Sequence, residues 1–132
     1  MLKRNKCFAL MLLAFALPFG CVGCSDGVSA SYDQISGVQA KALMDSESGY
    51  IIIDARTQSE YDEGHIPGAI MIPEYEIADR AEKELPDKDQ LILVYCRSGR
   101  RSKIAAEELV KLGYTNVKEF GDIIDWKYEI VK

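Results

Sequence analysis

One cysteine in this sequence stands where a reactive thiol would be expected. Leu91 to Tyr95 form an apolar run, Cys96 follows it, and the next six residues are Arg97-Ser-Gly-Arg-Arg-Ser102. A thiol attacks as its thiolate, so a nucleophilic cysteine needs surroundings that lower its pKa from about 8.5. Three arginines, the N–H groups of a glycine-containing turn and the positive end of a following helix all favour negative charge here. The pattern predicts a nucleophile in an anion-binding loop. The alternative is a cysteine that packs as a small apolar side chain beside solvated arginines.

The length of this loop indicates which cysteine chemistry it would serve. Cysteine phosphatases place an arginine six positions after the cysteine, whereas here Ser102 holds position six and Arg101 holds position five. Tyr95 also stands where phosphatases usually have histidine. A shorter loop suits a smaller guest, namely one extra sulfur atom held as a persulfide whose charge the loop amides stabilise. A phosphatase or an arsenate-reductase-like enzyme stays an alternative, and the second would also need a partner thiol.

Short apolar runs alternate with helical patterns along the rest of the chain. Strands are expected at 50–54, 69–72, 91–95 and 117–120, and helices at 38–44, 59–63, 74–83, 102–112 and 123–129. Ser59 is expected to cap the second of these helices. The apolar face of the fourth is expected to hold Ile104, Ala105, Leu109 and Leu112. The alternation predicts an α/β fold whose parallel sheet is covered by helices on both faces. Ligands of such sheets bind beyond the carboxyl ends of the strands, and Cys96 lies at one of these ends.

The N-terminal segment has the pattern of an export signal. Three basic residues within Met1–Lys6 precede an apolar run of 13 residues, Cys7–Phe19, which is shorter than the roughly 20 residues of a membrane-spanning helix. The next stretch, Val22-Gly-Cys24-Ser, resembles a bacterial lipobox. Residues 1–23 are therefore predicted to be a signal peptide, Cys24 the lipidated mature N-terminus, 24–31 a tether and 32–132 the domain. Cys21 is a rival site for the lipid, and a simply secreted product is the other alternative. We expect the protein to be anchored by its lipid to a membrane, outside the cytoplasm.

Composition limits the remaining classes of function. The chain has 132 residues, enough for one domain, and a formal charge of −5. Residues 1–23 hold three basic and no acidic side chains, so 13 basic and 21 acidic side chains remain without them, a charge of −8. Nucleic acid is therefore not an expected partner. With Cys7 and Cys21 removed and Cys24 lipidated, Cys96 would be the only free thiol and could form no internal disulfide.

Two further motifs accompany the cysteine loop. Tyr61-Asp-Glu-Gly-His-Ile-Pro-Gly-Ala-Ile70 follows Ile53-Asp-Ala-Arg-Thr57, and Phe120-Gly-Asp-Ile-Ile-Asp-Trp126 lies near the C-terminus. Together with Cys-Arg-x-Gly-x-Arg, these stretches resemble a single-domain rhodanese, or thiosulfate sulfurtransferase. Asp122 replaces the second glycine of the family's Gly-Gly segment. The resemblance extends over about residues 32–128 and implies a three-layer α/β fold with a central parallel sheet of about five strands.

The resemblance also implies roles for the residues of the site. Cys96 would accept a sulfur atom as a persulfide, and Gly99 would allow the tight turn. The backbone amides of the loop would cradle the persulfide, and its arginine side chains would hold the donor; these residues are Arg97, Ser98, Gly99, Arg100, Arg101 and Ser102. Asp54 and Arg56 would border the pocket or, alternatively, brace loops through an ion pair. His65, the only histidine, is expected to fix its turn through hydrogen bonds, and Trp126 to lie in the core.

The implied reaction has two half-reactions and needs no metal or cofactor. A small anionic sulfur donor such as thiosulfate would charge Cys96, and an external thiol or cyanide would remove the sulfur. The protein is expected to be a monomer. The alternative from another class is a non-catalytic binding or sensing module on the same scaffold.

Overall fold

The structure, a computed structural model, describes residues 31–132. The predicted signal peptide 1–23, the lipid on Cys24 or Cys21 and all but the last residue of the tether 24–31 lie outside the described residues. Within residues 31–132, no helix has both the length and the apolar character needed to cross a membrane.

A five-stranded sheet forms the centre of the domain, with strand order β1-β5-β4-β2-β3. All neighbouring strands pair in parallel. The prediction of a parallel sheet of about five strands is therefore confirmed. The strands are β1 (Asp33–Gln34), β2 (Ile51–Asp54), β3 (Ile70–Met71), β4 (Ile92–Cys96) and β5 (Val117–Asp122). β1 is the one strand that the apolar pattern did not predict, because its two residues are polar and exposed.

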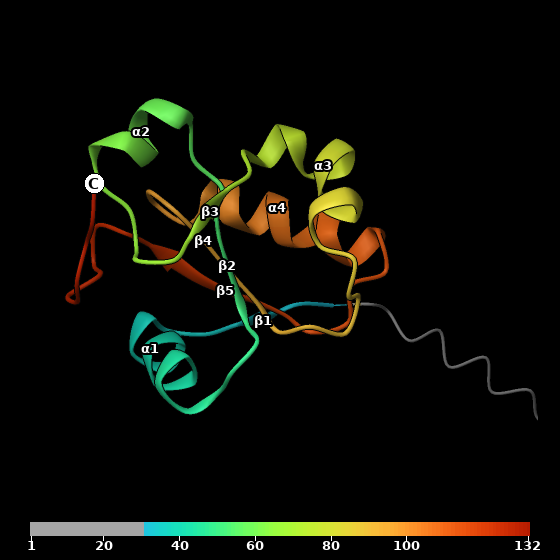
Figure 1. Cartoon of the computed structure of the whole chain (residues 1–132), viewed down its shortest axis with the longest axis horizontal. Coiled ribbons are helices and arrows are strands. Elements are labelled where there is room, and N and C mark those ends of the chain that lie inside the picture. The colour runs from blue at the N-terminus through green and yellow to red at the C-terminus, as the bar shows by residue number, and fades with distance from the viewer. Residues whose placement is uncertain (1–30) are drawn as a thin grey trace, which may run out of the picture.

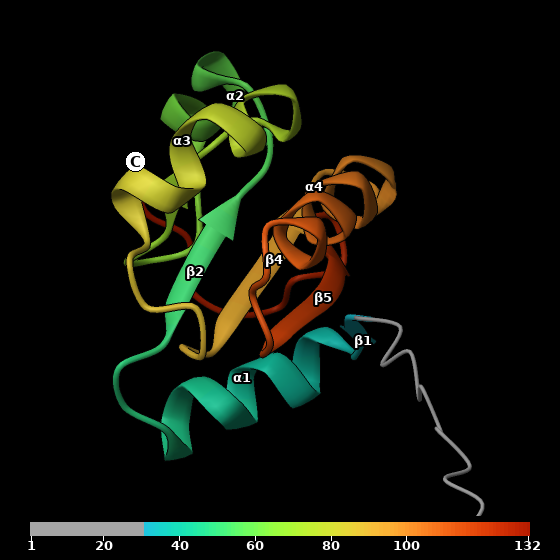
Figure 2. The same ribbon diagram turned by 90° about the vertical axis from the view of Figure 1, so that its right-hand side faces the viewer.

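Helices cover both faces of this sheet, as expected. α3 and α4 lie on one face and α1 on the other (Figures 1 and 2), while α2 lies between β2 and β3 along the chain. The helices are α1 (Gly37–Ser46), α2 (Gln58–Glu63), the short 3₁₀ helix η1 (Glu74–Glu76), α3 (Ile77–Glu84) and α4 (Arg100–Lys111). The single helix expected at 74–83 is thus divided into η1 and α3.

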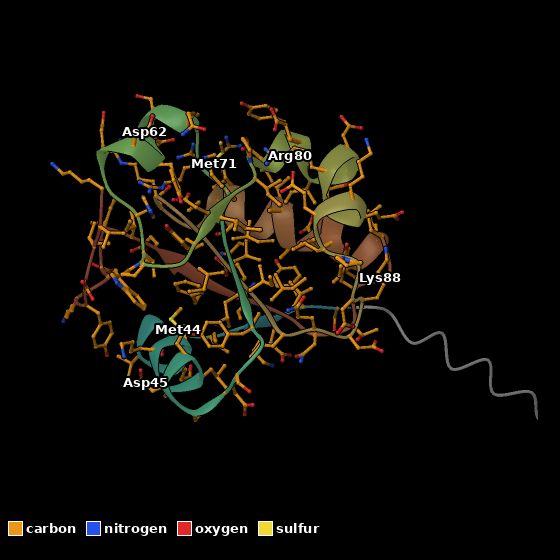
Figure 3. The ribbon with its side chains drawn as sticks, viewed as in Figure 1. Met44, Asp45, Asp62, Met71, Arg80 and Lys88 are labelled. Atoms are coloured by element: carbon orange, nitrogen blue, oxygen red, sulfur yellow. The ribbon has the colours of Figure 1, made fainter. Side chains whose placement is uncertain are left out.

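Side chains of β4 alternate between two hydrophobic clusters, one on each face of the sheet. Ile92, Val94 and Cys96 join the cluster beneath α3 and α4. Leu93 and Tyr95 join the cluster that contains Ala40 of α1, with Met44 packed against it. In Figure 3, Met44 on α1 and Arg80 on α3 lie on opposite sides of the sheet. The alternation therefore directs the Cys96 side chain toward α4.

α2 is capped by Thr57, and the predicted cap at Ser59 is wrong. The Thr57 hydroxyl accepts a hydrogen bond from the Glu60 amide, and the Glu60 carboxylate accepts one from the Thr57 amide at 3.0 Å. This reciprocal capping box satisfies two N–H groups that a helix start leaves free, so the helix begins directly after Thr57.

The helix predicted at 123–129 is not present. This segment is irregular, and it continues to Val131, which pairs with His65 through two backbone hydrogen bonds of 2.9 Å. Trp126 lies in the core as expected, with 9% of its surface exposed, and its indole N–H donates to the Glu129 carbonyl. The C-terminus consequently lies beside the end of α2 (Figure 1).

α4 begins at Arg100, two residues before the predicted start at Ser102, and its buried face differs from the predicted one. Ser102, Ala105, Ala106 and Leu109 are buried, whereas Ile104 is 38% exposed. The predicted face shares Ala105 and Leu109 with the observed one, but it included the exposed Ile104 and omitted the small residues Ser102 and Ala106, which fit close to the sheet.

The two faces of α4 give a test of this packing. Leu109 is fully buried between α4 and the sheet, so Leu109→Ala should lower the free energy of unfolding by about 2–5 kcal/mol. Ile104→Ala, on the same helix, should cost less than about 1 kcal/mol. Urea denaturation of both variants measures the difference. Equal costs would contradict the observed orientation of α4.

Candidate active site

Cys96 is the last residue of β4 and is fully buried. Among residues 31–132 it is the only cysteine. Three residues, Arg97 to Gly99, connect it to α4. Gly99 has a φ of 92°, in the left-handed region that favours glycine, and it turns the chain so that its own N–H donates to Cys96 Sγ at 2.9 Å. The tight turn predicted at Gly99 is thus present and brings a backbone donor onto the sulfur.

The N-terminus of α4 lies directly behind this turn. Gly99 is its N-cap residue, and no side chain caps the helix. The first N–H groups of a helix have no partner within it, and the helix dipole places partial positive charge there. The helix terminus and the Gly99 amide thus both place partial positive charge beside the sulfur.

The three arginines that the sequence groups together have different surroundings. Arg97 and Arg100 are exposed, and neither forms an ion pair within the described part of the chain. Arg101 is partly buried and binds both carboxylate oxygens of Glu60 on α2, at 2.7 and 2.8 Å. This hydrogen-bonded ion pair lowers the pKa of Glu60 to about 2. Arg101 thus fastens α4 to α2, and only Arg97 and Arg100 have free guanidinium groups.

The Ser102 side chain contacts the Cys96 sulfur, and the Glu119 side chain contacts Ser102. The Ser102 hydroxyl is 3.4 Å from Cys96 Sγ and donates to Glu119 Oε1 at 2.6 Å. Both side chains are buried, with 0% and 3% of their surface exposed. Glu119 was not predicted as a site residue. The sequence feature that could have identified Glu119 is its place in the expected strand, two positions after Val117. This spacing puts both side chains on the same face of the sheet, so an acidic residue is buried there.

Asp54 and Arg56 form the ion pair that was the alternative interpretation for them. Arg56 donates to both carboxylate oxygens of Asp54 and, at 2.7 Å, to the Gly64 carbonyl. The Tyr95 hydroxyl donates to Asp54 at 2.7 Å and accepts from the Ile66 amide. Burial, together with the charge of Asp54, raises the pKa of Tyr95. This network holds the turn at residues 64–66, and neither member of the ion pair hydrogen-bonds Cys96.

His65 fixes the same turn, as the sequence predicts. Its Nδ1 lies 2.9 Å from the Tyr61 carbonyl, and its ring stacks on the Tyr61 ring with centroids 3.6 Å apart. Among the described residues, no group of three or more His, Cys, Asp or Glu side chains is arranged to hold a metal ion.

A cavity of about 490 Å³ lies elsewhere, between the start of α1 and the C-terminal segment. Its lining includes Phe120, Asp122, Trp126 and Tyr128 but not Cys96. The lining of this cavity contains no thiol and no histidine. We therefore place the candidate active site at Cys96 and not at this cavity.

This chain is similar to several known proteins. The family model of the rhodanese-like domain matches residues 36–127. Thiosulfate sulfurtransferase PspE of Escherichia coli is 41% identical over 73 residues, which cover 55% of this chain and 70% of that protein. Thiosulfate sulfurtransferase GlpE of Coxiella burnetii is 34% identical over 97 residues, 73% of this chain and 88% of that protein. A solved structure described as a rhodanese with anions from E. coli has a TM-score of 0.60 and 38% identity, covering 63% of this chain and 98% of its own.

The ion pair between α2 and α4 predicts a pH dependence of stability. The pKa of Glu60 is about 2 in the folded protein against an ordinary 4.5, so the pair stabilises the fold fully above about pH 4.5 and less as the pH falls toward 2. Glu60→Gln keeps the capping geometry but removes the charge. It should lower the free energy of unfolding by about 2 kcal/mol at pH 7 and by about half of that at pH 3.

Urea denaturation at the two pH values measures this difference. Glu63→Gln, an exposed position at the end of the same helix, serves as the control and should show no such change. A cost for Glu60→Gln that stays the same at both pH values would contradict the role assigned to the pair.

Proposed function

Because the chain belongs to the rhodanese-like family, we propose that it is a sulfurtransferase whose nucleophile is Cys96. The observation that carries this proposal is the hydrogen bond from the Gly99 amide to Cys96 Sγ at the start of α4. This hydrogen bond brings a backbone donor and a helix N-terminus to the thiol. Both features would stabilise a negatively charged sulfur. The two similar proteins named thiosulfate sulfurtransferases support the same reaction class.

The proposed reaction proceeds in two balanced steps. The Cys96 thiolate attacks the outer sulfur of thiosulfate, the bond between the two thiosulfate sulfurs breaks, and sulfite leaves with the bonding electron pair. Cys96 then carries a persulfide, Cys–S–S⁻. A thiolate or cyanide attacks the terminal sulfur, and the Cys96 thiolate leaves. The covalent intermediate divides one transfer into two easier steps and implies ping-pong kinetics.

The site favours a narrow donor over a bulky one. Only three residues separate Cys96 from α4, and the Cys96 side chain has no exposed surface, so a donor can meet the sulfur only after a local rearrangement. One terminal sulfur atom fits this constraint better than a tetrahedral phosphate. The alternative of a phosphatase therefore has less support.

Arg97 and Arg100 are proposed to hold the anionic donor. Arg100 stands in the first turn of α4, where a cation opposes the helix dipole by about 0.3–1 kcal/mol, and that turn contains no acidic residue. Arg100 thus destabilises its own helix slightly and has no carboxylate partner within the described residues. Binding of an anionic ligand would explain why an arginine stands at this position. A solved E. coli structure described as a rhodanese with anions is consistent with this.

We further propose that residues 1–23 direct export and that Cys24 carries a lipid. The domain would then face a membrane surface outside the cytoplasm, with a tether of residues 24–31. The support is the sequence pattern alone. Intact mass of the membrane-extracted protein tests it: Cys24→Ser should lose the lipid mass, whereas Cys21→Ser should keep it. Loss with Cys21→Ser alone would move the site to Cys21.

The sulfur-accepting role of Cys96 predicts a change in mass. Incubation of the full chain with thiosulfate should add the mass of one sulfur atom, and cyanide should remove it with formation of thiocyanate. Cys96→Ser should show neither change, because it lacks the nucleophile. Mass spectrometry measures the adduct. Absence of any adduct or turnover with small sulfur donors would overturn the proposal, and hydrolysis of a phosphate ester instead would favour a phosphatase.

The donor-binding arginines predict a separation between affinity and stability. Replacing both Arg97 and Arg100 by alanine should raise KM for thiosulfate about tenfold at low salt and less at high salt, because screening weakens the attraction. The free energy of unfolding should not fall, since no ion pair is lost. Lys127→Ala, an exposed position away from the loop, is the control. Unchanged KM in the double variant would contradict this role.

A further inference from the structure

A buried chain of three side chains connects the nucleophile to an acid. Cys96 Sγ lies 3.4 Å from Ser102 Oγ, and Ser102 Oγ lies 2.6 Å from Glu119 Oε1. These contacts place the carboxylate oxygen at most about 6 Å from the sulfur. None of the three side chains has more than 3% of its surface exposed. Water therefore has little access to the path between them.

The hydroxyl of Ser102 has one hydrogen and several acceptors around it. Glu119 Oε1 at 2.6 Å is the shortest, followed by the Gly99 carbonyl at 3.1 Å and the Gly121 carbonyl at 3.4 Å. Because the hydrogen is directed at one of these oxygens, Ser102 presents a lone pair to the sulfur. The chain is therefore ordered as a thiol donating to a hydroxyl that donates to a carboxylate.

Glu119 has no cation of its own. Within residues 31–132 it forms no ion pair, and the other partner of its carboxylate is the Gly121 amide, which donates to Oε1 at 2.8 Å. Burying a carboxylate without a cation is costly, and a second negative charge close by would add to the cost. A charged sulfur and a charged Glu119 would therefore repel each other, which couples the two groups.

The other charged groups around the site leave this coupling in place. Arg101 of α4 is close enough to Cys96 for an electrostatic interaction, but its guanidinium is already bound to the Glu60 carboxylate of α2. Lys118, the neighbour of Glu119 in β5, binds Asp33 of β1. Arg97 and Arg100 also lie near the loop, and both are exposed. Glu74 of η1 interacts electrostatically with Arg101. Asp122 of β5 lies opposite Cys96 in the sheet register.

We propose that Cys96 and Glu119 share one proton through Ser102. The proton has two proposed positions: on the sulfur beside an ionised Glu119, or on Glu119 beside a thiolate. When the thiolate forms, the thiol proton passes to Ser102 Oγ while the Ser102 hydrogen passes to Glu119 Oε1. The chain S–H···O–H···⁻O becomes S⁻···H–O···H–O, with no net change in charge or in the number of protons. Ser102 then donates to the sulfur, beside the Gly99 amide.

The same proton has a place in the sulfur transfer, and this part rests on the proposed function. The persulfide is an anion, so a proton kept on Glu119 limits the buried pair to one negative charge while sulfur is bound. It returns to the sulfur after the acceptor has removed the persulfide sulfur. Glu119 would thus be a positioning residue that acts on Cys96 through Ser102 and stores its proton.

Alkylation of the thiol tests the coupling and needs no sulfur donor. Glu119→Gln keeps an acceptor oxygen for Ser102 and for the Gly121 amide but removes the charge. The full chain is treated with iodoacetamide between pH 5 and 9, and modification is followed on the tryptic peptide Asp89–Arg97, which separates Cys96 from the other cysteines. Two unit charges about 6 Å apart at an effective dielectric constant of about 20 alter an equilibrium by about a hundredfold.

We therefore expect Cys96 to react at least about tenfold faster at pH 7 in Glu119→Gln than in the wild type. Glu107→Gln removes a charge from the exposed side of α4 and should leave the rate unchanged. An unchanged or slower rate in Glu119→Gln would overturn the proposal, because a purely structural Glu119 would be replaced by Gln without effect on the thiol.

Infrared spectroscopy of the wild type locates the proton and does not depend on the folding of a variant. Charging the full chain with thiosulfate should produce the carbonyl band of a protonated carboxylic acid, and cyanide should remove it. A sulfur adduct seen by mass without this band would overturn the shared proton. Failure to take up sulfur at all would contradict the proposed function instead, and the alkylation result, which needs no donor, would still decide the shared proton.

Discussion

The tight junction between β4 and α4 is the constraint on which the site depends. β4 ends at Cys96 and α4 begins at Arg100, so three residues must reverse the chain and start a helix. The left-handed conformation of Gly99 makes this possible and aims its amide at the sulfur. The burial of Cys96, the proximity of the helix N-terminus and the contact with Ser102 in the first turn all follow from this short connection.

Ion pairs hold the elements around that junction without taking part in it. Arg101 fastens α4 to α2 through Glu60, and Arg56 fastens the end of β2 to the turn at residues 64–66. The pairing of His65 with Val131 connects the C-terminal segment to the same turn. These contacts explain why two of the arginines near the site, Arg56 and Arg101, are structural, whereas Arg97 and Arg100 form no ion pair within residues 31–132.

The sequence was sufficient to predict four of the five strands, the helices that cover the sheet and the cysteine loop, because apolar runs and their spacing carry that information. Contacts distant in sequence were harder to predict: Glu60 meets Arg101 across 41 residues, and Glu119 meets Ser102 across 17. The two polar residues of β1 form a strand only because β5 is beside them. The prediction of a helix at 123–129 was wrong because Trp126 and its apolar neighbours suggest a helical face, although the segment is irregular and leads into the backbone pairing of Val131 with His65.

The central claim is that Cys96 takes the outer sulfur of its donor. Thiosulfate labelled with radioactive sulfur in the outer position, given to the full chain without an acceptor, tests it most directly. We predict label on the peptide Asp89–Arg97 under non-reducing conditions, in equal amount to unlabelled sulfite released into solution. Label that enters this peptide equally from the inner sulfur, or that never binds it, would contradict the claim.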